Sequence, residues 1–329
     1  MAQIAKQTSY ARLVLALGAA LALAPQGASA QQYPSQDIHF ICAFPAGSGA
    51  DVLVRYVAEK MRPLAGKPIL VENKVGNAGM IAAEYAARSK PDGYTIYVHA
   101  ASTVAANMWL MKKPPVDAVK DFIVAGTINR QPFMLAVPVQ SPYKSVAELT
   151  EAMKKKGDKA TYMQSNATGK VMGELYKRAT GIAAVDVPYR TANESLNDFT
   201  SGVLDFGMVD PVFAQAQERE GRIRNLAVST AQRMQAVPNL PTMVELGYTD
   251  IHIQGWFAGL VPSATPRPII EQLNKWFVEV ISTDDARKFL NANGGDPNIS
   301  TIEEGQAALI QDVKDWEGYV KTAKIEPQG

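Results

Sequence analysis

The sequence has little of what disulfide cross-linking, metal binding or nucleophilic catalysis requires. Its 329 residues include one cysteine, Cys42, so an internal disulfide is excluded and a buried, inert thiol is expected. The three histidines (His39, His99 and His252) stand apart from one another, and no metal-ligand spacing such as His-x-x-x-His occurs. A Gly-x-Ser-x-Gly nucleophile elbow is also missing. We therefore predict no catalytic residue, no metal and no cofactor.

Long apolar runs are also scarce. The run from Leu13 to Ala24 has about 12 residues, too few to span a bilayer. It follows two basic residues and precedes Ala28-Ser29-Ala30, a small-x-small cleavage site, so residues 1–30 are predicted to be a signal peptide cleaved near Ala30. Without Lys6 and Arg12 the formal net charge changes from +1 to −1, which leaves no broad basic face for nucleic acid. We expect a soluble, exported protein with no nucleic-acid partner.

A glycine-bearing turn follows the first predicted strand. It reads Phe44-Pro45-Ala46-Gly47-Ser48-Gly49-Ala50-Asp51 and leads into apolar residues at helical spacing. Such a turn leaves backbone N–H groups free at the positive end of a helix dipole, which favours an anion. A second turn of similar design, Val75-Gly76-Asn77-Ala78-Gly79, precedes the next predicted helix. The alternative, ordinary α/β turns that bind nothing, stays open. Neither turn has the lysine of a nucleotide-binding P-loop.

The order of predicted elements indicates an α/β fold. Strands are expected at 37–43, 69–73 and 94–99, with helices between them at 50–62 and 80–88. A β–α–β–α–β order implies a parallel sheet, and ligands of such sheets bind at the carboxyl ends of the strands. Both glycine turns lie there, as do Ser102 and Thr103 after the third strand.

The same kind of pattern restarts at residue 133 and continues to about 230. Two such units, joined by extended runs near 128–137 and 248–259, predict two lobes with a cleft between them. We expect lobe 1 to comprise 31–132 and 252–329, and lobe 2 to comprise 133–251. Each lobe should be a mostly parallel sheet flanked by helices.

Several motifs together resemble the Bug receptors, the TctC-like periplasmic substrate-binding proteins of tripartite tricarboxylate transporters. The resemblance covers residues 37–329, and the order and spacing of the motifs make it specific. The motifs are Phe44 to Asp51, Val71-Glu72-Asn73-Lys74-x-Gly76-Asn77-Ala78-Gly79, Pro91-Asp92-Gly93-Tyr94-Thr95, Val119-Lys120-Asp121-Phe122, Pro188-Tyr189-Arg190 and Ala323-Lys324-Ile325-Glu326-Pro327.

The resemblance implies a two-lobed, type II-like periplasmic binding protein that closes on a small carboxylate. In the family, backbone groups and ordered water at the first two glycine turns hold one carboxylate. The candidate ligand-binding residues of lobe 1 are Phe44, Ala46, Gly47, Ser48, Asp51, Asn77, Ala78, Gly79, Ser102 and Thr103. Those of lobe 2 are Ser165, Asn166, Thr168, Gly169, Lys170, Tyr189, Arg190 and Asp210.

The chain departs from the family pattern at several positions. Ala46 and Ser48 replace the usual Pro and Gly, and Lys170 stands where the family often has His. Lys170 and Arg190 are either partners of a second carboxylate or surface cations. Trp256 and Phe257 are either an aromatic pocket wall, suited to a flat ligand, or core residues.

The resulting interpretation is a monomeric receptor, not an enzyme, for a di- or tricarboxylate that it delivers to membrane transporter subunits. An aromatic ligand such as a phthalate or nicotinate is included. Two alternatives stay open: a sensor that presents its closed form to a sensor kinase, and an exported enzyme acting on a carboxylate.

Overall fold

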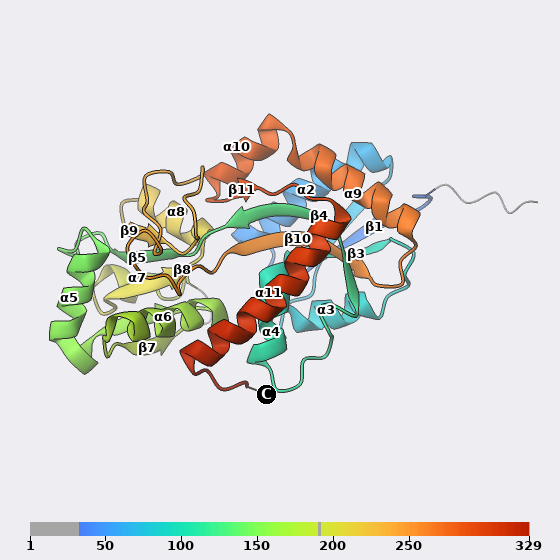
Figure 1. Cartoon of the computed structure of the whole chain (residues 1–329). Coiled ribbons are helices and arrows are strands. Elements are labelled where there is room, and N and C mark those ends of the chain that lie inside the picture. Colours follow the sequence, from blue (N-terminus) through green and yellow to red (C-terminus); the bar gives the residue numbers. More distant parts are fainter. Residues whose placement is uncertain (1–32, 190–191, 329) are drawn as a thin grey trace, which may run out of the picture. The chain divides into compact units, whose positions relative to one another are not determined.

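The computed structural model describes residues 33–189 and 192–328. The predicted signal peptide and Arg190 therefore lie outside the described residues. Within them the chain forms two β-sheets, each flanked by helices (Figure 1). Both sheets belong to one compact unit, residues 36–329.

The first sheet has six strands in the order β11-β4-β10-β3-β1-β2 among the described residues. Its strands are β1 (Ile38–Cys42), β2 (Ile69–Asn73), β3 (Thr95–Ala100), β4 (Phe122–Gln131), β10 (Gly255–Pro262) and β11 (Asp296–Pro297). β1 pairs in parallel with β2 and β3, whereas β10 runs antiparallel to both β3 and β4. Cys42 is fully buried in β1, as expected, and burial raises the pKa of its thiol to about 11.

Helices cover both faces of the first sheet. They are α2 (Gly49–Ala65), α3 (Met80–Ala87), α4 (Ala101–Leu110), α9 (Arg267–Ile281), α10 (Asp284–Ala292) and α11 (Ile302–Ala323). α2 and α9 lie on one face (Figure 1). There Phe277 of α9 stacks on Phe40 of β1 with ring centroids 6.3 Å apart. α3, α4 and α11 lie on the other face and bury an alanine-rich layer against Tyr97 and Leu260.

The second sheet has five strands in the order β7-β6-β8-β5-β9. Its strands are β5 (Met134–Pro138), β6 (Thr161–Gln164), β7 (Val185–Pro188), β8 (Phe206–Val209) and β9 (Ile223–Val228). Its helices are α5 (Val146–Lys156), α6 (Ala167–Thr180), α7 (Leu196–Thr200) and α8 (Pro211–Arg219). β6 pairs in parallel with β7 and β8, and β5 runs antiparallel to β8 and β9.

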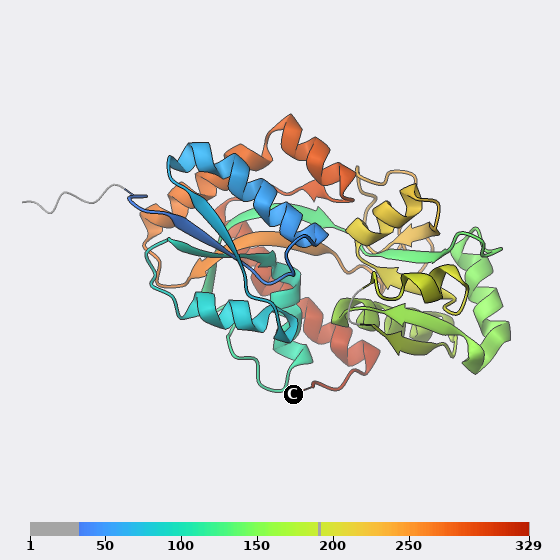
Figure 2. The ribbon, with the colours of Figure 1, turned by 180° about the vertical axis from the view of Figure 1, so that it is seen from behind.

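In the described residues, the chain crosses between the two sheets from β4 into β5 and again through 248–254 into β10 (Figure 2). Because β4 and β5 continue one another and β10 returns between β3 and β4, each sheet contains antiparallel strands. Both sheets are therefore mixed, where the sequence pattern suggested mostly parallel ones. α11 contacts α6, and one apolar cluster runs from Trp256 and Trp316 to Val171 across both parts.

Candidate functional site

Two bends and one helix start come together at one edge of the first sheet. β1, β2 and β3 are parallel, so the segments after their carboxyl ends lie along the same edge. These segments are residues 44–49, here the first bend, residues 76–79, here the second bend, and the start of α4. The structure thus assembles the lobe 1 candidates that the sequence places there.

The first bend ends in a capped helix start. Ser48 is the N-cap of α2 and its Oγ accepts from the backbone N–H of Asp51 at 3.3 Å. Gly47 has φ = 79°, a left-handed conformation that glycine adopts without strain. Its N–H donates to Oδ2 of Asp51 at 2.8 Å, which closes the bend.

The buried carboxylate of Asp51 stabilises this bend through hydrogen bonds. Its side chain is 1% exposed and also accepts from Arg55 Nε at 2.8 Å and Asn73 Nδ2 at 2.7 Å. Burial alone would raise the pKa of Asp51, but the hydrogen bonds from Arg55, Asn73 and Gly47 outweigh it and keep the pKa below its ordinary value. These contacts make Asp51 a positioning residue; its predicted contact with a ligand stays a prediction.

The second bend has an unusual backbone. Gly76, Asn77, Ala78 and Gly79 have φ of 134°, 47°, 49° and 87°. The left-handed region costs about 1 kcal/mol for a residue with a Cβ, so Ala78 is held there by its surroundings. Asn107 of α4 donates Nδ2–H to the Ala78 carbonyl at 2.9 Å. The Tyr97 hydroxyl donates to the Gly79 carbonyl at 3.0 Å.

These contacts leave backbone donors unused. Within the described residues, no hydrogen bond is found from the backbone N–H groups of Gly49, Ala50, Asn77, Ala78, Ser102 and Thr103. Neither α3 nor α4 has a side-chain cap at its N-terminus. Several N–H groups at three neighbouring helix starts can therefore bind an anion at this edge.

Aromatic rings lie beneath the two bends. The ring of Phe44 is half-buried and lies 4.5 Å from the imidazole of His99 and 5.8 Å from the ring of Phe257, centroid to centroid. Trp256 is 5% exposed and donates its indole N–H to Asp312 of α11 at 2.9 Å. This favours the core interpretation for Trp256, whereas Phe257 packs directly against a residue of the first bend.

The lobe 2 candidates share an edge of the second sheet. The segments 165–170 and 210–211 and Tyr189 follow β6, β8 and β7, which are parallel neighbours. Lys170 is about one-third exposed, and its Nζ lies 3.5 Å from a carboxylate oxygen of Asp186. The lysine thus has an acidic neighbour already.

Three other lobe 2 candidates also have internal partners. Asn166 caps α6 through the N–H of Gly169 at 2.8 Å, and the Tyr189 hydroxyl donates to Asp198 at 2.7 Å. Asp210 caps α8 through the N–H of Phe213 at 3.0 Å. Burial raises the pKa of Asp210 although backbone N–H groups oppose the shift.

The two edges meet at one point. A Cβ added to Gly49, the first residue of α2, would collide with Cγ1 of Val212 in the first turn of α8. Glycine at this position therefore lets the first bend and α8 approach closely. Candidates from both lobes are brought to the same region by this contact.

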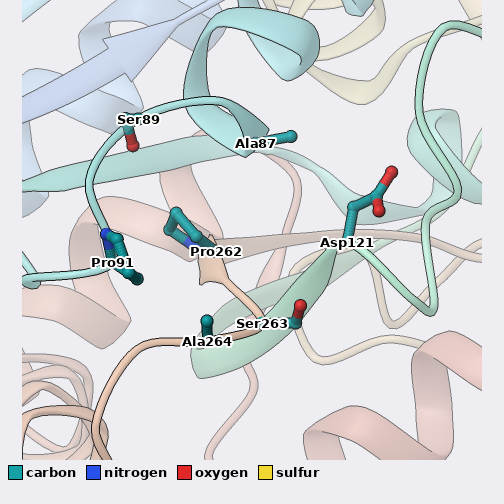
Figure 3. Close-up of a pocket in the computed structure, with 7 residues that line it drawn as sticks. All are labelled: Ala87, Ser89, Pro91, Asp121, Pro262, Ser263 and Ala264. Carbon is teal, nitrogen blue, oxygen red and sulfur yellow. The ribbon is translucent and has the colours of Figure 1, made fainter.

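A shallow cavity lies elsewhere. It has a volume of about 170 Å³ and is lined by Ala87, Ser89, Pro91, Asp121, Pro262, Ser263 and Ala264 (Figure 3). These residues precede β3 and β4 or lie at and just after the end of β10, so the cavity lies at the opposite edge of the first sheet from the two bends. No predicted site residue lines it.

Among residues 33–189 and 192–328, no three His, Cys, Asp or Glu side chains are grouped as a metal ion would require. In the same residues, no helix combines the length and apolar character needed to cross a bilayer.

Sequence reasoning missed four residues that support the bends: Asn73, Tyr97, His99 and Asn107. Asn73 is the last residue of β2, and Tyr97 and His99 share one face at the end of β3. Their positions at strand ends carried a signal, but polar residues there also occur in ordinary turns.

This fold and site define the class of two-lobed periplasmic binding proteins. The solved structure of the periplasmic binding protein BugD is 28% identical, with a TM-score of 0.79, and covers 90% of this chain and 100% of BugD. A structure from R. palustris solved with adipate is also 28% identical, with a TM-score of 0.83 over 90% of this chain and 100% of that chain.

The family follows from sequence. Residues 53–324 match the tripartite tricarboxylate transporter family receptors, and the chain belongs to this family. Protein BugT of Bordetella pertussis is 28% identical over 316 residues, which are 94% of this chain and 97% of BugT. The resemblance to Bug receptors drawn from the motifs is thereby confirmed, as is the two-lobed α/β fold.

Proposed function

We propose that this chain captures a small di- or tricarboxylate in the periplasm and delivers it to the membrane subunits of a tripartite tricarboxylate-type transporter. The ligand is bound without chemical change, between lobe 1 (31–132 and 252–329) and lobe 2 (133–251), by a monomer whose signal peptide is removed. Aromatic carboxylates such as phthalate or nicotinate belong to the same proposal.

One observation carries the proposal: backbone N–H groups without partners at three helix starts share one edge of the first sheet. Carboxylates are stabilised by such donors and by the positive ends of the helices. The nearest acidic side chain of the first bend, Asp51, is already paired with Arg55. An anion at this edge would therefore find hydrogen-bond donors and little electrostatic repulsion.

The far end of the ligand faces lobe 2. We assign the second carboxylate to Lys170, which would exchange its contact with Asp186 for one with the ligand. The relative from R. palustris was solved with adipate, a dicarboxylate of matching chemistry. An aliphatic dicarboxylate is thus the first ligand to test.

A thermal-shift screen tests the proposal. The mature protein is heated with adipate, its monocarboxylate analogue hexanoate, phthalate, nicotinate, several sugars and cationic amines. A carboxylate at 100 times its dissociation constant should stabilise the protein by roughly 2.7 kcal/mol, and sugars should not. Adipate should bind more tightly than hexanoate because only adipate offers a second carboxylate to Lys170.

The outcomes separate the alternatives. Stabilisation by a sugar with no response to any carboxylate would contradict the proposal. Equal affinity for adipate and hexanoate would show that Lys170 does not bind a second carboxylate. Recovery of the bound compound in altered form, measured by mass spectrometry, would favour an exported enzyme, and co-purification with a sensor kinase instead of transporter subunits would favour a sensor.

A further inference from the structure

His99 is a buried polar residue with no hydrogen-bond partner. Its side chain is 2% exposed, and neither ring nitrogen is hydrogen-bonded to any of the described residues. Buried polar groups are nearly always paired, so an unpaired one calls for a physical explanation. A phenyl ring would fit these surroundings without an unpaired nitrogen, because the side chains of Phe44 and Tyr97 that contact the imidazole are also aromatic.

The imidazole lies between the two bends. On one side its ring contacts the tilted ring of Phe44 in the first bend, with centroids 4.5 Å apart, and on another it stacks on Tyr97 with centroids 5.0 Å apart. Its Nε2 points at the second bend: a Cβ added to Gly79 would lie 2.7 Å from that nitrogen. Glycine at 79 thus permits the backbone to rest directly on the imidazole.

The second bend carries the unused N–H groups of Asn77 and Ala78. Gly79 covers Nε2 in this structure, so an anion bound to these groups would accept a hydrogen bond from Nε2–H, directly or through one water, when the second bend shifts on binding. Burial lowers the pKa of His99 to about 3, so the ring is neutral near pH 7 and has one N–H to donate. A neutral donor suits a carboxylate without adding charge.

We propose that His99 is a further ligand-recognition residue, whose Nε2–H donates a hydrogen bond to the bound carboxylate, directly or through one water. The inference rests on the proposed function, since it requires a carboxylate at the second bend. It explains why a polar ring stands unpaired at the base of the site: its missing partner is the ligand or the water that accompanies it.

His99→Phe is the decisive variant. Phenylalanine keeps an aromatic ring between Phe44 and Tyr97 and removes both nitrogens. The unliganded variant should be as stable as the wild type or more stable, because an unpaired buried polar group is lost. Its affinity for adipate, or for the carboxylate that stabilises the wild type most in the screen, should fall about tenfold to a hundredfold.

Two further variants sharpen the test. His99→Gln restores a side-chain N–H and should recover part of the affinity. Tyr176→Phe is the matched control: Tyr176 is a buried residue of lobe 2 whose hydroxyl contacts Thr150 at 2.6 Å. It should change stability without changing affinity.

Nitrogen-15 NMR gives a direct readout because the chain has only three histidines. Adding the carboxylate should shift the Nε2 resonance of His99 and leave that of His252 in place. If the wild type binds the carboxylate, but His99→Phe binds it equally well and no His99 resonance moves, the inference is overturned and the proposed function stands. If the wild type binds no carboxylate, the proposed function fails, and this inference fails with it.

Discussion

At the scale of single residues, the site depends on side chains that hold backbone in place. Asp51, Tyr97 and Asn107 accept from or donate to the bends and keep their N–H groups directed outward. The unused N–H groups of Asn77 and Ala78 share peptide units with the carbonyls of Gly76 and Asn77, which accept from the N–H groups of Gly79 and Met80, so the donor side of these two peptides is left for a ligand. In the proposed site, backbone N–H groups would therefore select a negatively charged ligand, and these side chains would fix their geometry.

Replacing Asp51 by Asn should destabilise the protein by about 1–3 kcal/mol at pH 7, since the amide keeps only one acceptor oxygen, turns its NH2 group toward a donor and removes the charge that pairs with Arg55. The native pKa of Asp51 is lowered, so the carboxylate stabilises the fold above the unfolded value of about 3.9, and this contribution is lost as pH falls through the native pKa. Urea unfolding of both proteins from pH 7 to pH 3 should show the difference shrinking.

Asp284→Asn is the control for Asp51→Asn. Its side chain is 85% exposed and makes only a 3.8 Å contact with Arg287. We expect a change within about 0.5 kcal/mol. Equal losses for the two variants would show that Asp51 does not support the first bend.

At the scale of secondary-structure elements, α11 ties the two parts of the chain together. It packs on α4 and β4 of the first part and on α6 of the second. Its Asp312 accepts the indole N–H of Trp256, the residue with which the chain returns to the first sheet. Burial raises the pKa of Asp312 to about 7, although the Trp256 hydrogen bond opposes the shift.

This pKa predicts a pH-dependent stability. The folded protein binds the proton of Asp312 more tightly than the unfolded chain does, so this residue's contribution falls as pH rises from about 4 through 7. Asp312→Asn keeps an acceptor for Trp256 and cannot ionise. Unfolding free energies at pH 5 and pH 8 should therefore favour the variant progressively at the higher pH, and parallel profiles would contradict the raised pKa.

At the scale of the whole molecule, the site requires that the two sheets present their edges to each other. Gly49 is the first residue of α2, which flanks the first sheet, and Val212 lies in the first turn of α8, which flanks the second sheet. The two residues approach so closely that a Cβ on Gly49 would collide with Val212. A side chain at 49 would hold these helix starts apart and weaken every contact that spans them. Closure on a ligand is therefore sensitive to the size of one residue.

Gly49→Ala should lower the affinity for a carboxylate, by about tenfold if one spanning contact is lost. Val212→Ala alone should bind normally, and the double variant should recover most of the affinity because the colliding methyl group is gone. Calorimetric titration of the three variants measures this. Unchanged binding by Gly49→Ala would show that the lobes need not approach at this point.

Local pattern determined much of this protein. Apolar periodicity, glycine turns and caps placed β2 at the residues predicted and β1, β3 and α3 within one residue at either end, because these signals act between neighbours in the chain. Motif order placed the chain in its family and both bends at strand ends. The roles of Lys170, Arg190 and the other candidate ligand contacts stay predictions.

Tertiary structure decided what depends on residues far apart in sequence. The antiparallel insertion of β10 between β3 and β4 brings Phe257 to Phe44, more than two hundred residues away. Likewise, the local sequence shows His99 only as one polar residue in an apolar strand. The tertiary packing shows that its ring nitrogens have no hydrogen-bond partner and that its ring lies against Gly79. Periodicity reports which face of an element is buried, whereas the partner on that face is chosen by the fold as a whole.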